Sequence, residues 1–234
     1  MCLTHLHPHL EEDTLSGWVK GLLTVVLWTL VPTGVVAAVL GASNNLPEQT
    51  WAVIVVAIFG LLYGLEAGIL TIYDLNGIGW FLLFVDMTWS ALNTVFGFVV
   101  GNIIFWIFGD PDRSQSENQG WIVFKPRSST GFGNNVLQTH GTLNLGGSGQ
   151  HEKMHLLQAR IFGPLYLPLF LVMYVVTSLI QVVWTITLGW ILAVAKVRQK
   201  AYFEPPASSA VSGFFGWIYY ATPFEIWAYA SGNP

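Results

Sequence analysis

The chain has 234 residues, of which 53% are hydrophobic and 9% are charged, and its formal net charge is −4. With a mean hydropathy of +0.55, this composition is typical of an integral membrane protein and excludes an ordinary soluble domain. The 9 Lys and Arg residues form no basic patch, which excludes a nucleic-acid-binding protein. Cys2 is the single cysteine, so an internal disulfide is excluded.

The N-terminal segment, residues 1–20, begins with histidines and acidic residues instead of the short basic region that starts a signal peptide. These are His5, His7, His9, Glu11, Glu12 and Asp13. We therefore expect no cleavable signal peptide, and we expect the first apolar stretch to direct the chain to the membrane.

Four apolar stretches are long enough to cross a hydrocarbon layer about 30 Å thick, which takes about 20 helical residues. They cover residues 21–41, 51–73, 78–108 and 165–195. Because lipid offers no partner for free backbone groups, each stretch is expected to be helical. The sequence thus predicts an all-α integral membrane protein with about four transmembrane helices, three within residues 21–108 and a long fourth within 164–200.

Two acidic residues interrupt the apolar stretches, Glu66 in the second and Asp86 in the third. A charge at the bilayer centre costs about 2.5 to 3.5 kcal/mol on insertion scales, so both should face protein or water. One hypothesis is a proton or ion path. The favoured hypothesis is a structural role, because no basic residue lies in any span. Gly60, Gly64 and Gly68 offer a close-packing face, either within the bundle or for a neighbouring subunit.

Residues 109–150 form a polar, glycine-rich loop between the third and fourth spans. Segments 121–124 and 142–145 have strand-like composition and predict a small β-hairpin, so the loop is expected to be partly β. The glycines at its end lead into residues 151–163, which we expect to form a helix that ends at a Gly-Pro pair.

That short helix begins with the pentapeptide His151-Glu152-Lys153-Met154-His155. Residues four apart share a face of a helix, so His151 and His155 can present two imidazoles to one zinc ion. Glu152 would then stand beside a bound water as the general base of a hydrolase. His140, in the preceding loop, is a spare ligand candidate.

The pentapeptide is followed by Gln158, by GPLY at residues 163–166 and by PFEIWA at residues 223–228. This series resembles uncharacterised bacterial multi-pass membrane proteins with a zincin-like pattern of H-E-x-x-H, Gln, G-P-L-Y and P-[FW]-E-x-x-A. The resemblance implies that Glu225 is the third metal ligand, which would complete the His-His-Glu set of zinc hydrolases. Such sequences often have a small residue in place of Met154 and an Asp in place of Tyr229.

Distance is the main obstacle to this ligand set. One continuous helix over residues 165–200 would be about 50 Å long and would deliver the tail to the membrane face opposite His151. The tail, residues 201–234, is rich in aromatic residues and is expected to re-enter the membrane or to lie at its interface. A bend near Gly189 is the alternative.

The six histidines all lie outside the apolar spans. Haem and chlorophyll usually need an axial ligand at membrane depth, so no pigment or haem ligation is expected within the spans. Six of the 11 tryptophans are instead expected near the ends of the spans, where their rings lie at the lipid interface: Trp18, Trp51, Trp80, Trp106, Trp121 and Trp190. The H-E-x-x-H pentapeptide makes zinc the candidate cofactor.

Two functions remain open at this stage. The favoured one is an accessory or structural subunit of a larger membrane complex, of photosynthetic or respiratory type, with a vestigial metal site. The alternative is a zinc-dependent membrane metallopeptidase that uses His151, His155, Glu225 and Glu152. In either case we expect a multi-pass protein of a bacterial inner membrane, whose partners are the lipid bilayer and other membrane subunits. Lys20 and the basic residues at 196–200 place both ends in the cytoplasm.

Overall fold

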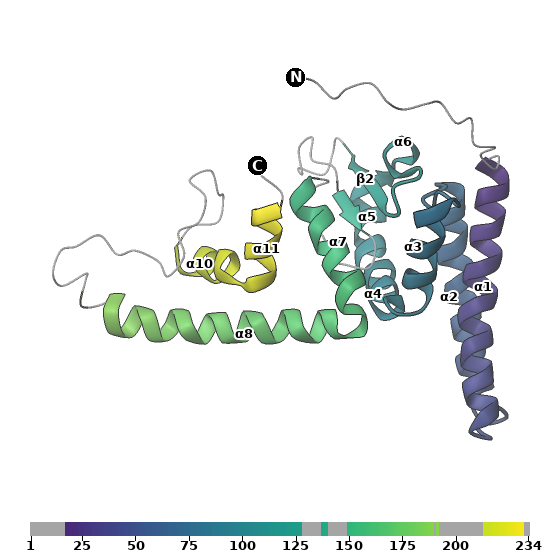
Figure 1. Cartoon of the computed structure of the whole chain (residues 1–234), viewed down its shortest axis with the longest axis horizontal. Coiled ribbons are helices and arrows are strands. Elements are labelled where there is room, and N and C mark those ends of the chain that lie inside the picture. Colours follow the sequence, from purple (N-terminus) through teal and green to yellow (C-terminus); the bar gives the residue numbers. More distant parts are fainter. Residues whose placement is uncertain (1–16, 128–136, 140–148, 190, 192–212, 232–234) are drawn as a thin grey trace. The chain divides into compact units, whose positions relative to one another are not determined.

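The computed structural model describes residues 17–127, 137–139, 149–189, 191 and 213–231 (Figure 1). Several features of the sequence lie outside these residues: the N-terminal histidines, His140, the strand-like segment 142–145 and the basic residues 196–200. The described helices and strands are α1 (Gly17–Ala42), α2 (Thr50–Ile69), α3 (Gly77–Met87), α4 (Ala91–Phe96), the π-helix η1 (Gly97–Asn102), α5 (Ile103–Phe108), β1 (Gly109–Pro111), α6 (Arg113–Ser116), β2 (Ile122–Pro126), β3 (Leu137–Thr139), α7 (Gln150–Phe162), the 3₁₀ turn η2 (Gly163–Leu165), α8 (Tyr166–Trp184), the π-helix η3 (Thr185–Gly189), α10 (Gly213–Ala221) and α11 (Pro223–Ser231).

The protein is an all-α multi-pass integral membrane protein, as the sequence predicts. Four helical stretches are long and apolar enough to cross a membrane: Gly17–Ala42, Thr50–Ile69, Ala91–Phe108 and Gln150–Leu188. Helices α1, α2 and α8 leave many of their Leu, Val and Ile side chains exposed. This is the arrangement expected where lipid, and not water, surrounds the helices.

The chain forms two compact units. The first lies within residues 1–84 and 112–122, and the second within residues 85–111 and 123–234.

In the first unit, α1 and α2 pack closely through glycines. A Cβ atom added at Gly68 would lie 2.6 Å from the carbonyl oxygen of Gly21, and one at Gly64 would lie 3.1 Å from Trp28 and Val25. Trp28 is buried and meets the ring of Tyr63 edge-on at 4.6 Å. Of the two roles left open for the glycine face, the structure therefore shows packing within the bundle.

The ends of this helix pair are held by polar contacts. Lys20, near the start of α1, forms an ion pair of 2.7 Å with Asp74, which follows α2. The backbone N–H groups of Asn118 and Gly120 donate to the carbonyls of Thr71 and Ile72, at 2.9 and 2.7 Å. These bonds attach the loop after α6 to the segment that follows α2.

The third apolar stretch is not the single helix that was expected over residues 78–108. Helix α3 ends at Met87, and the spanning stretch begins again at Ala91. With 11 residues, α3 is about 16 Å long, which is too short to cross. The correction has a physical cause, because residues 88–90 form a turn whose polar side chains bind the backbone of α7.

That turn and helix α4, which follows it, provide hydrogen-bond donors for the end of α7. The side-chain amide of Asn93 donates to the carbonyls of Ala159 (3.0 Å) and Gly163 (2.7 Å), and the hydroxyl of Ser90 donates to Ala159 (3.1 Å). The last carbonyls of a helix have no partner within the helix itself. Side chains from a distant part of the chain thus let α7 stop where it does.

Gly163 turns the chain from α7 into α8, and Figure 1 shows the two helices meeting at a sharp angle. Its φ is +54°, a conformation that other residues rarely adopt. A Cβ atom here would also collide with the ring of Trp89, whose Nε1 donates to the carbonyl of Ile161 at 3.1 Å. The glycine is therefore required by both backbone and packing.

The acid of the third stretch is paired, contrary to the expectation that no basic residue would be available. Arg160, on α7, donates to both carboxylate oxygens of Asp86, at 2.9 and 2.8 Å. Asp86 is 1% exposed. The structural role that the sequence favoured for this acid is thus realised as an ion pair. Glu66 is half-buried in α2, and its role stays a prediction.

The polar loop is partly β, in a three-stranded sheet of order β1-β2-β3. Strand β2 contains most of the predicted segment 121–124, but its described antiparallel partner β1 pairs Asp110 with Lys125. Phe124 is fully buried against Phe105 of α5, with ring centroids 5.5 Å apart. The sheet therefore rests on the end of the third spanning stretch.

The close crossing of α1 and α2 leads to a first prediction. Replacing Gly68 with Val inserts side-chain atoms against the backbone of Gly21, so we expect the free energy of unfolding in detergent to fall by about 1 to 3 kcal/mol. Gly34→Val is the matched control, because a Cβ atom at Gly34 meets nothing within 4 Å. Equal losses for the two variants, measured by thermal unfolding, would contradict this packing.

A second prediction concerns the buried ion pair. Asp86→Asn leaves the guanidinium of Arg160 buried without a counter-charge, which should cost about 3 to 5 kcal/mol of stability. Adding Arg160→Gln removes that unpaired charge, so the double variant should recover part of the loss. A double-mutant cycle of unfolding free energies measures this coupling, and additive losses would argue against the pair.

Candidate metal centre

The helix that contains the pentapeptide is stabilised by charged residues at its two ends. Helix α7 starts after Gly149, has Glu152 in its first turn and has Arg160 in its last turn. An acid near the N-terminus and a base near the C-terminus both complement the helix dipole. His151 and His155 lie on one face of α7, with ring centroids 4.8 Å apart, as the spacing predicts.

Glu225 comes from the other end of the second unit. It lies in the first turn of α11, two residues after Pro223, which starts this helix and is well suited to that position. Helix α10 packs against α8, and α11 packs against both α7 and α8 (Figure 1). Helices α10 and α11 thus lie beside α8 and α7, and Glu225 reaches the two histidines despite the long helix between them in the sequence.

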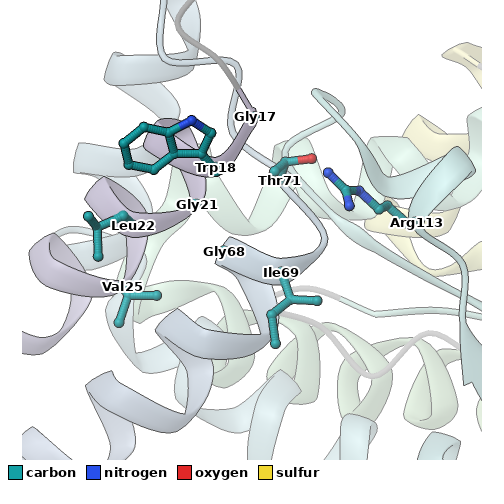
Figure 2. Close-up of a pocket in the computed structure, with 9 residues that line it drawn as sticks. All are labelled: Gly17, Trp18, Gly21, Leu22, Val25, Gly68, Ile69, Thr71 and Arg113. Carbon is teal, nitrogen blue, oxygen red and sulfur yellow. The ribbon is translucent and has the colours of Figure 1, made fainter.

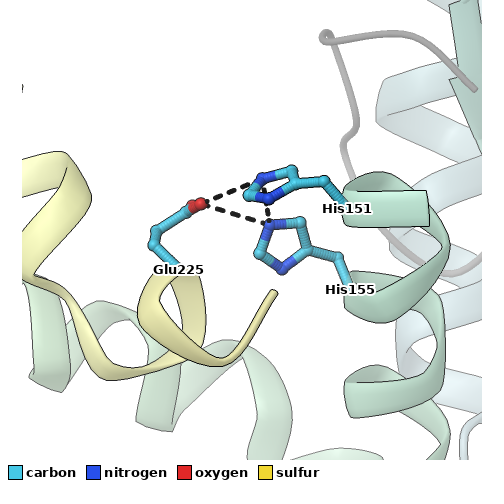
Figure 3. A group of neighbouring side chains, drawn as sticks. All are labelled: His151, His155 and Glu225. Carbon is cyan, nitrogen blue, oxygen red and sulfur yellow. Dashed lines mark hydrogen bonds and ion pairs between the residues drawn. The ribbon is translucent and has the colours of Figure 1, made fainter. Parts of the chain in front are cut away.

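The three side chains meet in a nearly equilateral triangle (Figure 3). The Nε2 atoms of His151 and His155 are 3.2 Å apart, and they lie 3.2 and 3.3 Å from Oε2 of Glu225. Tetrahedral zinc with bonds of about 2.0 to 2.1 Å separates its ligand atoms by about 3.3 to 3.4 Å. The triangle therefore has the dimensions of one face of such a coordination sphere, and it could hold a metal ion.

The environment of Glu225 fits a cation at this place. Glu225 is 2% exposed, and its buried Oε2 receives no well-directed hydrogen bond from the described residues. Burial alone would raise the pKa of Glu225, but the neighbouring His151 and His155 outweigh it and lower that pKa to about 2. The group is thus a carboxylate at any physiological pH, with a free oxygen directed at two imidazoles.

Gln158 fixes the orientation of His155. Its amide nitrogen donates to the carbonyl of Phe224 at 2.9 Å, so its Oε1 faces Nδ1 of His155, also at 2.9 Å. An amide oxygen only accepts, so Nδ1 must carry the proton and Nε2 keeps its lone pair for a metal. Since Phe224 precedes Glu225, the same side chain also connects the ligand-bearing ends of α7 and α11.

Tyrosines surround the remaining side of Glu225. The hydroxyl of Tyr174 donates to Oε1 of Glu225 at 3.2 Å, and Tyr219 is close enough to Glu225 to interact with its charge. Burial, followed by the charge of Glu225, raises the pKa of Tyr219 far above its ordinary value. Its phenol therefore remains a proton donor. The ring of Tyr229 lies against His151, with centroids 4.1 Å apart.

Glu152, the expected general base, is half-buried on α7. Its carboxylate interacts electrostatically with His151, His155 and Glu225, so it belongs to the same cluster. It is not part of the ligand triangle, which leaves its oxygens available for proton transfer.

The structure brings together the three ligand candidates that the sequence analysis named, His151, His155 and Glu225, and it places Glu152 next to His151 on α7, where its role as a base stays a prediction. The spare ligand candidate, His140, lies outside the described residues. The positioning roles of Gln158 and Tyr174 were missed. Gln158 could have been found from its spacing, since a residue three positions after His155 lies on the same side of a helix. No such signal marks Tyr174, which reaches Glu225 only through the packing of α8 and α11.

Comparisons of the chain with protein-family models, with curated proteins and with solved structures give no match. The interpretation of the site therefore depends on its own geometry.

The bridging position of Gln158 gives a third prediction. Gln158→Ala frees the ring of His155 and removes the bond to Phe224, so zinc affinity should fall about 10- to 100-fold. Gln150→Ala, at an exposed position of the same helix, should leave affinity unchanged. Competition with a zinc-binding dye measures both variants, and wild-type affinity in Gln158→Ala would rule out the positioning role.

Proposed function

We propose that this protein is a metal-dependent hydrolase of the membrane, with zinc as its metal and peptide bonds as its substrate class. The observation that supports this proposal is the triangle of His151 Nε2, His155 Nε2 and Glu225 Oε2, with sides of 3.2 to 3.3 Å. Two imidazoles and a carboxylate form the ligand set of hydrolytic zinc sites, which keep a fourth position for water or substrate.

Each residue then has a defined task. His151, His155 and Glu225 hold the metal, which when bound supplies Lewis-acid polarisation of the scissile carbonyl and of the attacking water. Glu152 accepts a proton from that water as the water oxygen bonds to the carbonyl carbon. Glu152 then gives this proton to the amide nitrogen as the carbon–nitrogen bond breaks. The products are a carboxylic acid and an amine, which exchange a proton to become a carboxylate and an ammonium group, and Glu152 returns to its starting state.

The other hypothesis, an accessory subunit of a larger membrane complex, accounts for the exposed apolar faces of the helices. It assigns no role to a buried carboxylate oxygen directed at two imidazoles, nor to the amide that fixes one of those imidazoles. The hydrolase proposal uses all of these features, and we therefore prefer it.

A fourth prediction separates ligand from base. His151→Ala removes one ligand, so the purified protein should lose its zinc as well as its activity. Glu152→Gln keeps the three ligands but removes the proton acceptor, so zinc content should stay near one ion per chain while the rate of peptide hydrolysis falls about 10²- to 10⁴-fold. Zinc is measured by atomic emission, and hydrolysis with a library of fluorogenic peptides.

Glu48→Gln is the matched control, because Glu48 is exposed in the turn between α1 and α2. It should change neither zinc content nor hydrolysis. Wild-type protein that binds no zinc under metal-replete conditions would refute the proposal, and so would full hydrolysis by Glu152→Gln.

A further inference from the structure

We propose that the first unit contains a binding site for the phosphate-bearing headgroup of an anionic phospholipid, at the end of the α1–α2 helix pair. This site is independent of the metal centre. It is a pocket of about 400 Å³, with apolar residues on one side and polar residues on the other (Figure 2).

The pocket lies at the level of the membrane where lipid headgroups are expected. Gly17 begins α1 and Ile69 ends α2, and both helices are long and apolar enough to span the membrane. The pocket lies where these two ends meet. Ends of spanning helices coincide with the level at which hydrocarbon gives way to headgroups.

The polar side contains a buried hydroxyl with no partner. Thr71 is 3% exposed, and its Oγ1 forms no hydrogen bond within the described part of the chain. Its φ is +50°, an unusual conformation for a β-branched residue. Figure 2 shows the hydroxyl of Thr71 directed toward the guanidinium of Arg113. A donor held in this way calls for an acceptor, which phosphate oxygens provide.

Arg113 supplies the charge. It is exposed, and no ion pair with it occurs among the described residues. The other cation at this end, Lys20, is neutralised by Asp74, while Asp112 accepts hydrogen bonds from Ser114 and Gln115. Arg113 is therefore the cation available to a phosphate, which its planar guanidinium can bind through two parallel hydrogen bonds.

The N-terminus of α1 adds to the positive electrostatic potential that Arg113 creates in the pocket. A helix N-terminus carries about half a positive charge and directs free N–H groups outward. Gly17 stands at this point, and a Cβ atom there would lie 3.6 Å from Nη2 of Arg113. The glycine thus leaves the space between the helix end and the guanidinium open.

The apolar side suits an acyl chain. Trp18, Leu22 and Ile69 line the pocket and are 72%, 54% and 66% exposed. Tryptophan is enriched at the lipid interface, where its ring bridges headgroups and hydrocarbon. No acidic side chain is among the lining residues that the structure describes, so nothing there would hold the cationic amine of a zwitterionic headgroup. An anionic lipid such as phosphatidylglycerol is therefore the expected ligand.

Native mass spectrometry of the full-length protein in detergent, with added phosphatidylglycerol or phosphatidylcholine, tests the site. We expect wild-type protein to prefer phosphatidylglycerol, and Arg113→Gln to reduce its binding about tenfold because a charge-assisted contact is lost. Thr71→Ala should reduce binding about threefold, and Thr71→Ser, which keeps the hydroxyl, should restore it. Arg127→Gln is the matched control, since Arg127 is an exposed arginine paired with Asp110 outside this pocket.

Adding inorganic phosphate in large excess shows whether the site binds a lipid headgroup or free phosphate. If free phosphate displaces the lipid completely, the site is a phosphate site and the lipid proposal is overturned. Equal binding of the two lipids, or wild-type binding by Arg113→Gln, would overturn it as well. Zinc content should be unaffected by Arg113→Gln, so this result stands apart from the test of the hydrolase.

Discussion

The second unit depends on how the backbone at the end of α7 is satisfied. A helix that stops leaves its last carbonyls without partners, and within a membrane water is not available to replace them. Here Trp89, Ser90 and Asn93 donate to these carbonyls from the turn before α4 and from α4 itself, about seventy residues earlier in the chain. Ending α7 in this way frees the chain to turn at Gly163, and this turn directs α8 away from the two histidines.

The same constraint explains the shape of the metal centre. Because α8 leaves α7 at a sharp angle, α10 can pack against α8 while α11 packs against α7. The ligands thus come from two segments about seventy residues apart, which are joined by the amide of Gln158. Within the second unit, an ion pair also joins Asp86 to Arg160 of α7. Each of these contacts is polar and buried, and such contacts are highly directional.

Much of this could be predicted from the sequence. Long apolar stretches predict helices in lipid because no other structure satisfies their backbone, so the all-α class and the number of spanning stretches followed from composition. The metal-site histidines followed from their spacing of four residues on one helix. Glu225 was named by a resemblance, and only the structure could show whether it reached them.

What was missed depends on contacts between distant segments. The break at residues 88–90 interrupts a stretch that is apolar enough to be one helix, and the roles of Ser90 in the break and of Asn93 in α4 become apparent only when α7 lies beside them. Arg160 lies outside the four apolar stretches, so it was not considered as the partner of Asp86. The glycines of α2 showed that a close neighbour was needed, but their spacing does not say which helix that neighbour is.

A site divided between α7 and α11 also connects metal binding to the integrity of the C-terminal region. An ion that binds to the three assembled side chains, but not to the chain with its C-terminal region detached, stabilises the docked state by mass action. This stabilisation is about 2.7 kcal/mol when the ion concentration is a hundred times the dissociation constant. Withdrawing the ion removes this stabilisation and leaves a buried carboxylate facing two imidazoles. The tail would then open more often, so metal supply would govern the susceptibility of this membrane protein to cellular proteases and hence its lifetime.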